Sequence, residues 1–271
     1  MSAQDALRAG RLDEALAELQ QEVRRKPAEA RLRIFLFQQL CVRGEWNRAL
    51  TQLNVAGELD AAALLMVQTY REALRCEVYR AEVFSGRRLP MSLGEPDGWF
   101  APLVQSLASA AQGRADLAAE QRRQAFDAAP PTPGKLNGES FEWIADGDSR
   151  LGPCLELIVS GRYYWLPFHR IHSIDLEPPA DLRDFVWLPA QVTWANGGEA
   201  VALIPTRYPG TEAAADPALR LSRRTEWQEQ PDQSYVGLGQ RAFITDTGET
   251  ALLDVRRIEI EPAGEFKPPP A

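Results

Sequence analysis

Two clusters of acidic residues are the first candidates for chemistry in this sequence. Asp146 and Asp148 lie just before Arg150, and a second pair of aspartates brackets an arginine within residues 181–184. Paired carboxylates can act as general acid and base in hydrolysis, or they can hold a metal ion. The arginine in each cluster supports a different interpretation, in which ion pairs hold the loops in place. We therefore expect a structural role for both clusters, with a metal-dependent hydrolase as the alternative function.

The only two histidines, His169 and His172, are three residues apart. On a helix, this spacing would let the two imidazoles share a metal ion. The segment follows a predicted strand and leads into Ile174, so we expect the two rings to face different directions. A histidine here could act in acid–base catalysis, but a structural or surface position is the simpler interpretation.

Motifs of known catalytic sites are absent from the sequence. A phosphate-binding loop needs a glycine-rich turn followed by Lys and then Ser or Thr, and the nearest glycine-rich segment, residues 237–241, is expected to be a turn into a strand. The cysteines Cys41, Cys76 and Cys154 are far apart and form no Cys-x-x-Cys, so we expect each to be a buried apolar residue. The sequence predicts no catalytic residues, no cofactor and no metal.

The length and net charge of the chain indicate its number of domains and the classes of partner that it does not bind. Its 271 residues favour two domains, and 30 basic against 38 acidic residues give a net charge of -8, which argues against nucleic-acid binding. Residues 1–133 hold 17 basic and 17 acidic residues, whereas residues 134–271 hold 13 and 21. Because neither a signal peptide nor an apolar run of about 18 residues is found, we expect a cytoplasmic protein without membrane insertion.

Small residues recur in the N-terminal half at a spacing typical of helical repeats. The pattern that starts at Gly10 recurs 34 residues later at Gly44, and a third unit starts at Gly113. It resembles the tetratricopeptide repeat (TPR), in which a glycine marks the turn between two helices. We expect residues 1–130 to form a TPR-like α-helical superhelix with a groove for a peptide or helix. A helical bundle that serves only as a scaffold is the alternative.

The C-terminal half has the composition of an antiparallel β domain. Residues 131–136 are rich in Pro and Gly, which predicts a linker. Short β-branched and aromatic runs separated by turn residues predict a small antiparallel β-barrel-like domain over residues 137–262. The fold class is thus α+β with more than one domain. The tail at residues 263–271 is expected to be disordered.

Three hairpins are predicted within this half, at residues 155–166, 191–204 and 242–255. Residues 208–233 show no periodicity, so we expect a long loop that carries Trp227.

Several ordered motifs in the second half resemble those of a known family. The series matches the ImpE family, also called TagJ, of accessory proteins of bacterial type VI secretion systems. The resemblance covers essentially the whole chain, because that family also has a helical, repeat-like N-terminal part. The motifs are FEWIADGDSRLGP at 141–153, GRYYWLPF at 161–168, LRDFVW at 182–187, RYPG at 207–210 and GLGQR at 237–241.

The resemblance implies a non-enzymatic cytoplasmic adaptor. Its partners would be the sheath subunit TssB, bound through its N-terminal helix, and ClpV, the ATPase that disassembles contracted sheaths. A general TPR-type chaperone is an alternative, and the acidic second half would favour a basic partner segment. Aromatic residues beside charged ones could form a recognition surface. The candidate protein-binding or motif residues are Trp143, Asp146, Asp148, Arg150, Trp165, Arg183, Asp184, Trp187, Tyr208, Trp227 and Arg241.

Overall fold

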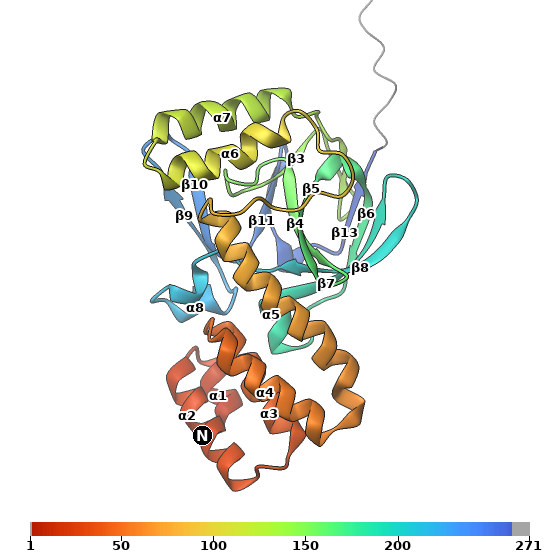
Figure 1. Ribbon diagram of the computed structural model, residues 1–271. Helices are drawn as coiled ribbons and strands as arrows, with labels where there is room; N and C mark the ends of the chain where they lie inside the picture. The colour runs from red at the N-terminus through yellow and green to blue at the C-terminus, as the bar shows by residue number, and fades with distance from the viewer. Residues whose placement is uncertain (1, 262–271) are drawn as a thin grey trace, which may run out of the picture.

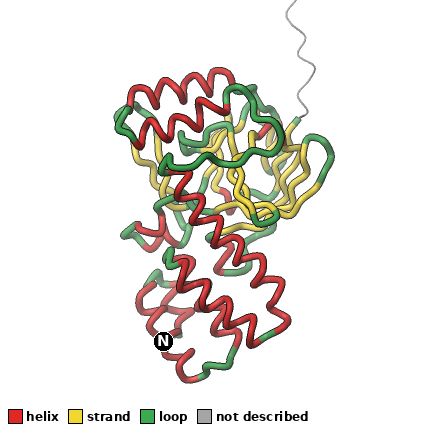
Figure 2. Tube along the Cα trace, in the orientation of Figure 1, coloured by secondary structure: helices red, strands yellow, loops and turns green. Residues whose placement is uncertain are grey.

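The protein is α+β, with helices first in the chain and strands after them (Figure 1). The structure is a computed structural model that describes residues 2–261. Figure 2 shows a purely helical lower part, a strand-rich upper part, and one long helix, α5, that connects the two. The helices are α1 (Ala3–Arg8), α2 (Leu12–Arg25), α3 (Ala30–Val42), α4 (Trp46–Leu59), α5 (Leu64–Phe84), α6 (Phe100–Ala111), α7 (Ala115–Ala128) and α8 (Pro217–Arg220).

The helices form because their apolar residues fall on one stripe. In α2, for example, Leu12, Leu16 and Leu19 are all buried, while the opposite face is charged. The turns before α2, α4 and α7 contain Gly10, Gly44 and Gly113, each with φ between +71° and +75°. Side chains disfavour this left-handed region, so the predicted glycine turns are confirmed. Membership of these helix pairs in the tetratricopeptide class stays a prediction.

The strands form one large antiparallel sheet and two small ones. The large sheet has the order β2-β1-β13-β6-β7-β8-β4-β5, and the small sheets are β12-β11-β3 and β10-β9. The strands are β1 (Gly134–Leu136), β2 (Glu139–Phe141), β3 (Ile144–Asp146), β4 (Cys154–Val159), β5 (Arg162–Pro167), β6 (Ile171–Leu176), β7 (Trp187–Trp194), β8 (Glu199–Pro205), β9 (Thr225–Glu229), β10 (Tyr235–Gly239), β11 (Ala242–Thr245), β12 (Gly248–Ala251) and β13 (Arg257–Ile260).

The barrel-like prediction is wrong, because the large sheet is open. In the part of the chain that the structure describes, its edge strands β2 and β5 do not pair with each other. The edge at β5 is instead covered by the connection after α5, where the carbonyl of Met91 accepts a hydrogen bond from the backbone N–H of Trp165 at 2.9 Å. An edge that another segment already covers does not need barrel closure to satisfy its backbone groups.

The predicted hairpins are observed with one change. The turn between β4 and β5 contains Ser160 and Gly161, both with positive φ, as a two-residue hairpin turn requires. The hairpin between β7 and β8 is also present. The third hairpin, predicted with a four-residue turn at 246–249, has a two-residue turn because Thr245 pairs with Gly248, and its second strand ends at Ala251.

The prediction of a long loop at residues 208–233 is wrong, since this segment contains α8 and β9. Trp227 is the one large apolar residue of β9 and the other four residues are polar, so the strand carries no apolar alternation by which the sequence could reveal it.

Two apolar cores stabilise the molecule. One joins side chains of the large sheet to Ile144 and Phe243 of the three-stranded sheet. The other joins side chains of the helices, such as Phe37 and Leu103, to Trp165 and Trp187 of the strands. The chain passes from α7 to β1 at residues 129–133, close to the predicted linker, and the division into domains stays a prediction. The predicted disordered tail lies outside the described residues. Among residues 2–261, no helix is both long and apolar enough to cross a bilayer.

Candidate functional site

A network of buried charges lies where α5 meets the strands, and we call it the junction network. It consists of Glu77, Arg80, Asp146, Glu156, Tyr163 and Arg241. At its centre, the Arg241 side chain is fully buried and pairs with both Asp146 and Glu156. Its Nε also donates to the backbone carbonyl of Pro205 at 2.9 Å. Each of the three guanidinium nitrogens of Arg241 therefore has a hydrogen-bond partner within the chain, as a buried charge requires.

The junction network attaches the long helix α5 to the sheet. Arg80 of α5 forms a bidentate pair with Glu156 of β4, with Nε and NH2 at 2.6 and 2.9 Å from the two carboxylate oxygens. One turn earlier, Glu77 accepts a hydrogen bond from the indole Nε1 of Trp187 in β7 at 2.8 Å. Charge-assisted and bidentate hydrogen bonds are strong and directional. They therefore fix both the distance and the rotation of α5 relative to the strands.

Burial affects Asp146 and Glu156, the two carboxylates that pair with Arg241, differently. Burial tends to raise the pKa of Glu156, but Arg80 and Arg241 outweigh it and hold the pKa at about 2. Burial raises the pKa of Asp146 to about 7 although Arg241 opposes the shift. The difference arises because Glu156 has two arginines and the donating hydroxyl of Tyr163, whereas Asp146 has one arginine and lies near Asp148.

The loop after β3 is held by Asp148, whose side chain is fully buried. Its carboxylate accepts hydrogen bonds from Nε of Arg150 at 2.8 Å and from the backbone N–H of Gly237 at 3.0 Å. In the second acidic cluster, Asp184 accepts from the backbone N–H groups of Ala180 and Asp181 at 2.9 and 2.8 Å. In each cluster one aspartate pairs with the nearby arginine as the sequence predicts, Asp148 with Arg150 and Asp181 with Arg183, whereas Asp146 pairs with Arg241 and Asp184 is held by backbone N–H groups.

Among the candidate aromatic residues, most point into the interior. Trp165, Trp187 and Tyr208 are fully buried, whereas Trp143 is 40% exposed. Trp227 lies on β9 and donates from its indole Nε1 to Glu249 at 3.3 Å. The prediction that these residues bind a partner therefore concerns chiefly Trp143 and the partly exposed Trp227.

The arginine candidates divide in the same way. Arg241 is buried, while Arg150 and Arg183 are partly exposed and pair with Asp148 and Asp181. Arg183 also lies over the ring of Tyr70, with 4.7 Å between the guanidinium carbon and the ring centroid.

The histidines and cysteines are placed as expected. His169 is partly buried with Nε2 3.5 Å from a carboxylate oxygen of Asp97, whereas His172 is exposed on β6. The three cysteines are free and buried. Within residues 2–261, no group of three or more His, Cys, Asp or Glu side chains is arranged to hold a metal ion.

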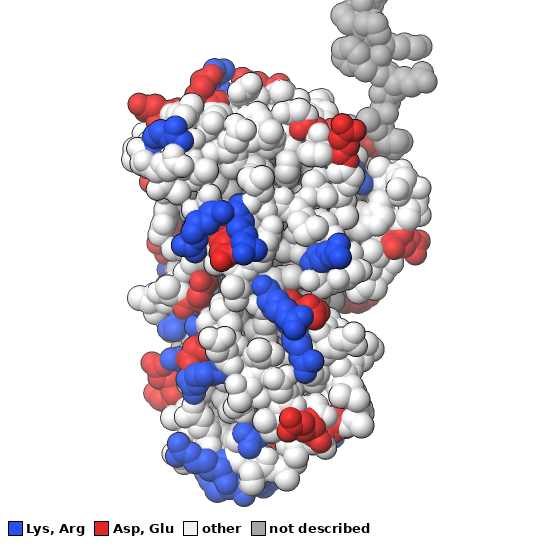
Figure 3. Space-filling view, in the orientation of Figure 1, with Lys and Arg blue, Asp and Glu red and all other residues white. Residues whose placement is uncertain are grey.

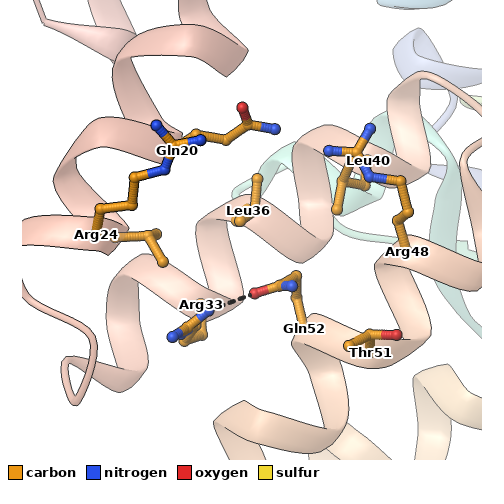
Figure 4. A pocket seen from close by; sticks show the side chains of 9 residues that line it. Gln20, Arg24, Arg33, Leu36, Leu40, Arg48, Thr51 and Gln52 are labelled. Atoms are coloured by element: carbon orange, nitrogen blue, oxygen red, sulfur yellow. Dashed lines mark hydrogen bonds between the residues drawn. The ribbon is translucent and has the colours of Figure 1, made fainter.

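A second arginine-rich feature lies on the outside of the helices, and we call it the helical groove. Figure 3 shows basic side chains gathered at the lower end of the molecule, over the N-terminal helices. The groove has a volume of about 420 Å³ and lies between α2, α3 and α4 (Figure 4). Its lining consists of Gln20, Val23, Arg24, Arg33, Leu36, Leu40, Arg48, Thr51 and Gln52.

The lining of the helical groove carries positive charge and no carboxylate. Buried Leu36 and Leu40 form part of its floor, and Figure 4 shows Arg24 and Arg48 on opposite sides of them. Arg33 donates to the side-chain oxygen of Gln52 at 2.9 Å, which holds its guanidinium at the groove. An apolar floor between cationic groups can bind a segment that has both apolar and acidic side chains.

Sequence reasoning predicted a groove in this half but missed its residues, and it also missed most of the junction network. One signal for the network was present, because Glu156 stands alone as a charge within an apolar strand. A buried charge in such a strand needs a partner elsewhere in the fold. For the groove, the signal was the basic segment from Arg24 to Arg33, in which cationic residues outnumber acidic ones.

Comparison with known proteins agrees with the family resemblance. The family model described as "ImpE protein" matches residues 138–259. A protein of Pseudomonas aeruginosa named "Type VI secretion system accessory component TagJ" is 55% identical over 262 residues, which is 97% of this chain and 92% of that protein. The crystal structure of protein VPA1032 from Vibrio parahaemolyticus has a TM-score of 0.87 at 24% identity, covers 96% of this chain and 97% of its own, and supports the fold alone. On the strength of the near full-length identity, this chain belongs to the ImpE family, also called TagJ.

Proposed function

We propose that this protein is a non-enzymatic adaptor of a bacterial type VI secretion system and acts in the cytoplasm. In this role it binds the sheath subunit TssB through that subunit's N-terminal helix. It also associates with the ATPase ClpV and thereby assists disassembly and recycling of contracted sheaths. The observation that carries the proposal is the 55% identity, over nearly the whole chain, to a relative named as an accessory component of this system.

The surface and interior of the described residues are consistent with this role. The helical groove offers an apolar floor of the kind that receives one face of an amphipathic helix. Both acidic clusters, which would be the residues of a hydrolase, are engaged by arginines or backbone N–H groups. These contacts favour binding over catalysis as the activity of the protein.

The test is co-elution of the purified full-length protein with TssB in size-exclusion chromatography. We expect a complex with intact TssB and none with TssB that lacks its first helix. TssB from which a C-terminal segment of the same length has been removed is the matched control and should still bind. Binding that persists without the first helix would contradict the proposed mode.

A second measurement addresses ClpV. We expect tagged ClpV to retain this protein when TssB is present, and omission of TssB separates direct from bridged association. If neither TssB nor ClpV binds at micromolar concentration, the proposed function is wrong. Equal binding to a panel of unrelated peptides would instead support a general chaperone.

A further inference from the structure

The helical groove has a charge that specifies the kind of helix it can receive. We propose that it is the docking site of the partner helix, and that this helix is amphipathic with acidic side chains beside its apolar stripe. The inference rests on the proposed function for the existence of a helical partner. The site and the sign of the charge come from the groove itself.

The shape of the groove fits one face of a helix. Three helices line it, so it is a depression between α2 and α4 with α3 below. Val23, Leu36 and Leu40 are buried there, which leaves an apolar base beneath polar walls. Apolar side chains at i, i+3 and i+4 of a helix can enter such a depression together.

The charge of the groove selects an acidic partner. Arg24, Arg33 and Arg48 line it, and only Arg48 has an ion pair, with Glu45, among residues 2–261. Arg33 already donates to Gln52 and to the carbonyl of Pro27, so its guanidinium is oriented before any partner arrives. Cationic groups on both sides of an apolar floor match a helix with carboxylates on both sides of its apolar stripe.

Further arginines close to the helical groove in the chain extend its positive charge. Arg25 and Arg31 are exposed near the groove in the chain, and neither has an ion-pair partner in the described part of the protein. A cluster of unneutralised arginines raises the rate of encounter with an acidic segment. A pocket of about 540 Å³ beside β7 has the opposite character, since four acidic residues and one arginine line it: Asp175, Glu177, Asp181, Asp184 and Arg183.

The decisive variant reverses charge inside the groove. We expect Arg24→Glu/Arg33→Glu in the full-length protein to weaken binding of a labelled peptide of the TssB N-terminal helix at least tenfold in fluorescence anisotropy. The matched control is Arg87→Glu/Arg114→Glu, which changes the net charge equally at exposed arginines outside the groove. The control should alter Kd less than twofold. Calorimetry with intact TssB should show the same order of affinities, with the groove variant binding more weakly than the control.

Two results separate this inference from the proposed function. If the unmodified protein binds TssB and the groove variant binds equally well, the docking site is wrong while the adaptor role stands. If the unmodified protein binds no TssB, the adaptor role fails.

A second probe tests the charge preference of the groove whether or not the protein binds TssB. It consists of two designed amphipathic peptides with the same apolar face, flanked by Glu in one and by Lys in the other. Tighter binding of the Glu peptide that is lost in the groove variant supports the inference. Tighter binding of the Lys peptide overturns it.

Discussion

The junction network and the helical groove are both built around arginines, yet they differ in whether the chain supplies the partners. Arg241 is fully buried and has two carboxylates and a backbone carbonyl, whereas Arg24 is exposed and has no carboxylate within residues 2–261. A buried charge without a partner is very costly, so the fold must provide one. An exposed charge is solvated by water, needs no partner within the chain and remains available to another molecule. The comparison teaches that pairing within the chain separates structural arginines from those that we propose to bind a partner.

The two regions also differ in how visible they are in the sequence. Asp146, Tyr163 and Arg241 of the junction network lie in the distinctive motifs of the second half. The residues of the helical groove lie in no motif. Distinctive sequence in this protein thus marks buried polar contacts, while the candidate docking site is marked only by unpaired charge.

The largest effect on stability is expected when the junction network loses its central arginine. Arg241→Met should lower the free energy of unfolding by about 3–5 kcal/mol, because Asp146 and Glu156 then lose a buried counter-charge. Urea denaturation measures this change. The control Arg224→Met removes an arginine that is half exposed and paired with Asp216, and should cost less than about 1 kcal/mol. Equal losses in the two variants would abolish the distinction between buried and exposed arginines.

A smaller effect should separate Glu156 from Asp146, the two carboxylates that pair with Arg241. At pH 7 we expect Glu156→Gln to cost about 3 kcal/mol and Asp146→Asn about 1 kcal/mol. Glu156, with a pKa of about 2, is ionised between two arginines, whereas burial raises the pKa of Asp146 to about 7 and so favours its neutral form, which an asparagine resembles. Chemical denaturation of both variants tests the order. A larger loss from Asp146→Asn than from Glu156→Gln would show that Asp146, and not Glu156, anchors Arg241.

The pH dependence of the free energy of unfolding should reveal the contribution of Glu156. The pKa of Glu156 is about 2 in the folded protein against 4.5 ordinarily, so its contribution is complete above pH 4.5 and is lost as the pH falls towards 2. The loss should approach about 1.4 kcal/mol per pH unit. Unfolding of the unmodified protein and Glu156→Gln is compared between pH 3 and pH 7. The difference between them should shrink below pH 4.5, and a constant difference would contradict the low pKa.

Asp146 should act in the opposite sense. Because its pKa is raised from 3.8 to about 7, the folded protein keeps a proton that the unfolded chain releases. Its contribution to stability therefore decreases as the pH rises from about 4 to about 7. The Asp146→Asn variant should lack this decrease when its unfolding is measured over the same pH range.

The smallest effect on stability is expected at the helical groove. Arg24→Glu/Arg33→Glu should change the free energy of unfolding by no more than about 0.5 kcal/mol per substitution, because neither side chain has a carboxylate partner to lose. Thermal unfolding followed by circular dichroism provides the measurement. If the free energy of unfolding fell by about 3 kcal/mol, these arginines would be structural, and the distinction between the two regions would be wrong.

Local features of the fold were predictable because they depend on residues close together in the chain. The helical stripe of α2, the glycine turns and the β4–β5 hairpin each follow from a spacing of a few residues. Features that need distant pairing were not. The barrel-like prediction failed because the cover of the β5 edge comes from Met91, more than 70 residues before the strand it contacts.

The candidate site shows the same limit. The repeat pattern predicted a groove among the first helices, but the sequence alone could not say which arginines would line it. Arg24 and Arg48 are on separate helices, and only the packing of both beside α3 brings them to one depression. Trp165 and Trp187 were candidates for a surface, and the packing of α5 against the strands buried them.

The sequence by itself determined that a helical half precedes a strand-rich half, where the glycine turns between the helices fall, the β4–β5 hairpin and the family, because each follows from local spacing or from ordered motifs. It did not reveal α8 and β9, which lack such a pattern. Only the tertiary structure decided which charges are satisfied. Whether an arginine such as Arg80 is buried beside Glu156 depends on how residues 76 positions apart pack. The physical reason is that burial and pairing are properties of the whole packed chain, and they decide whether a charge stabilises the fold or remains available to a partner.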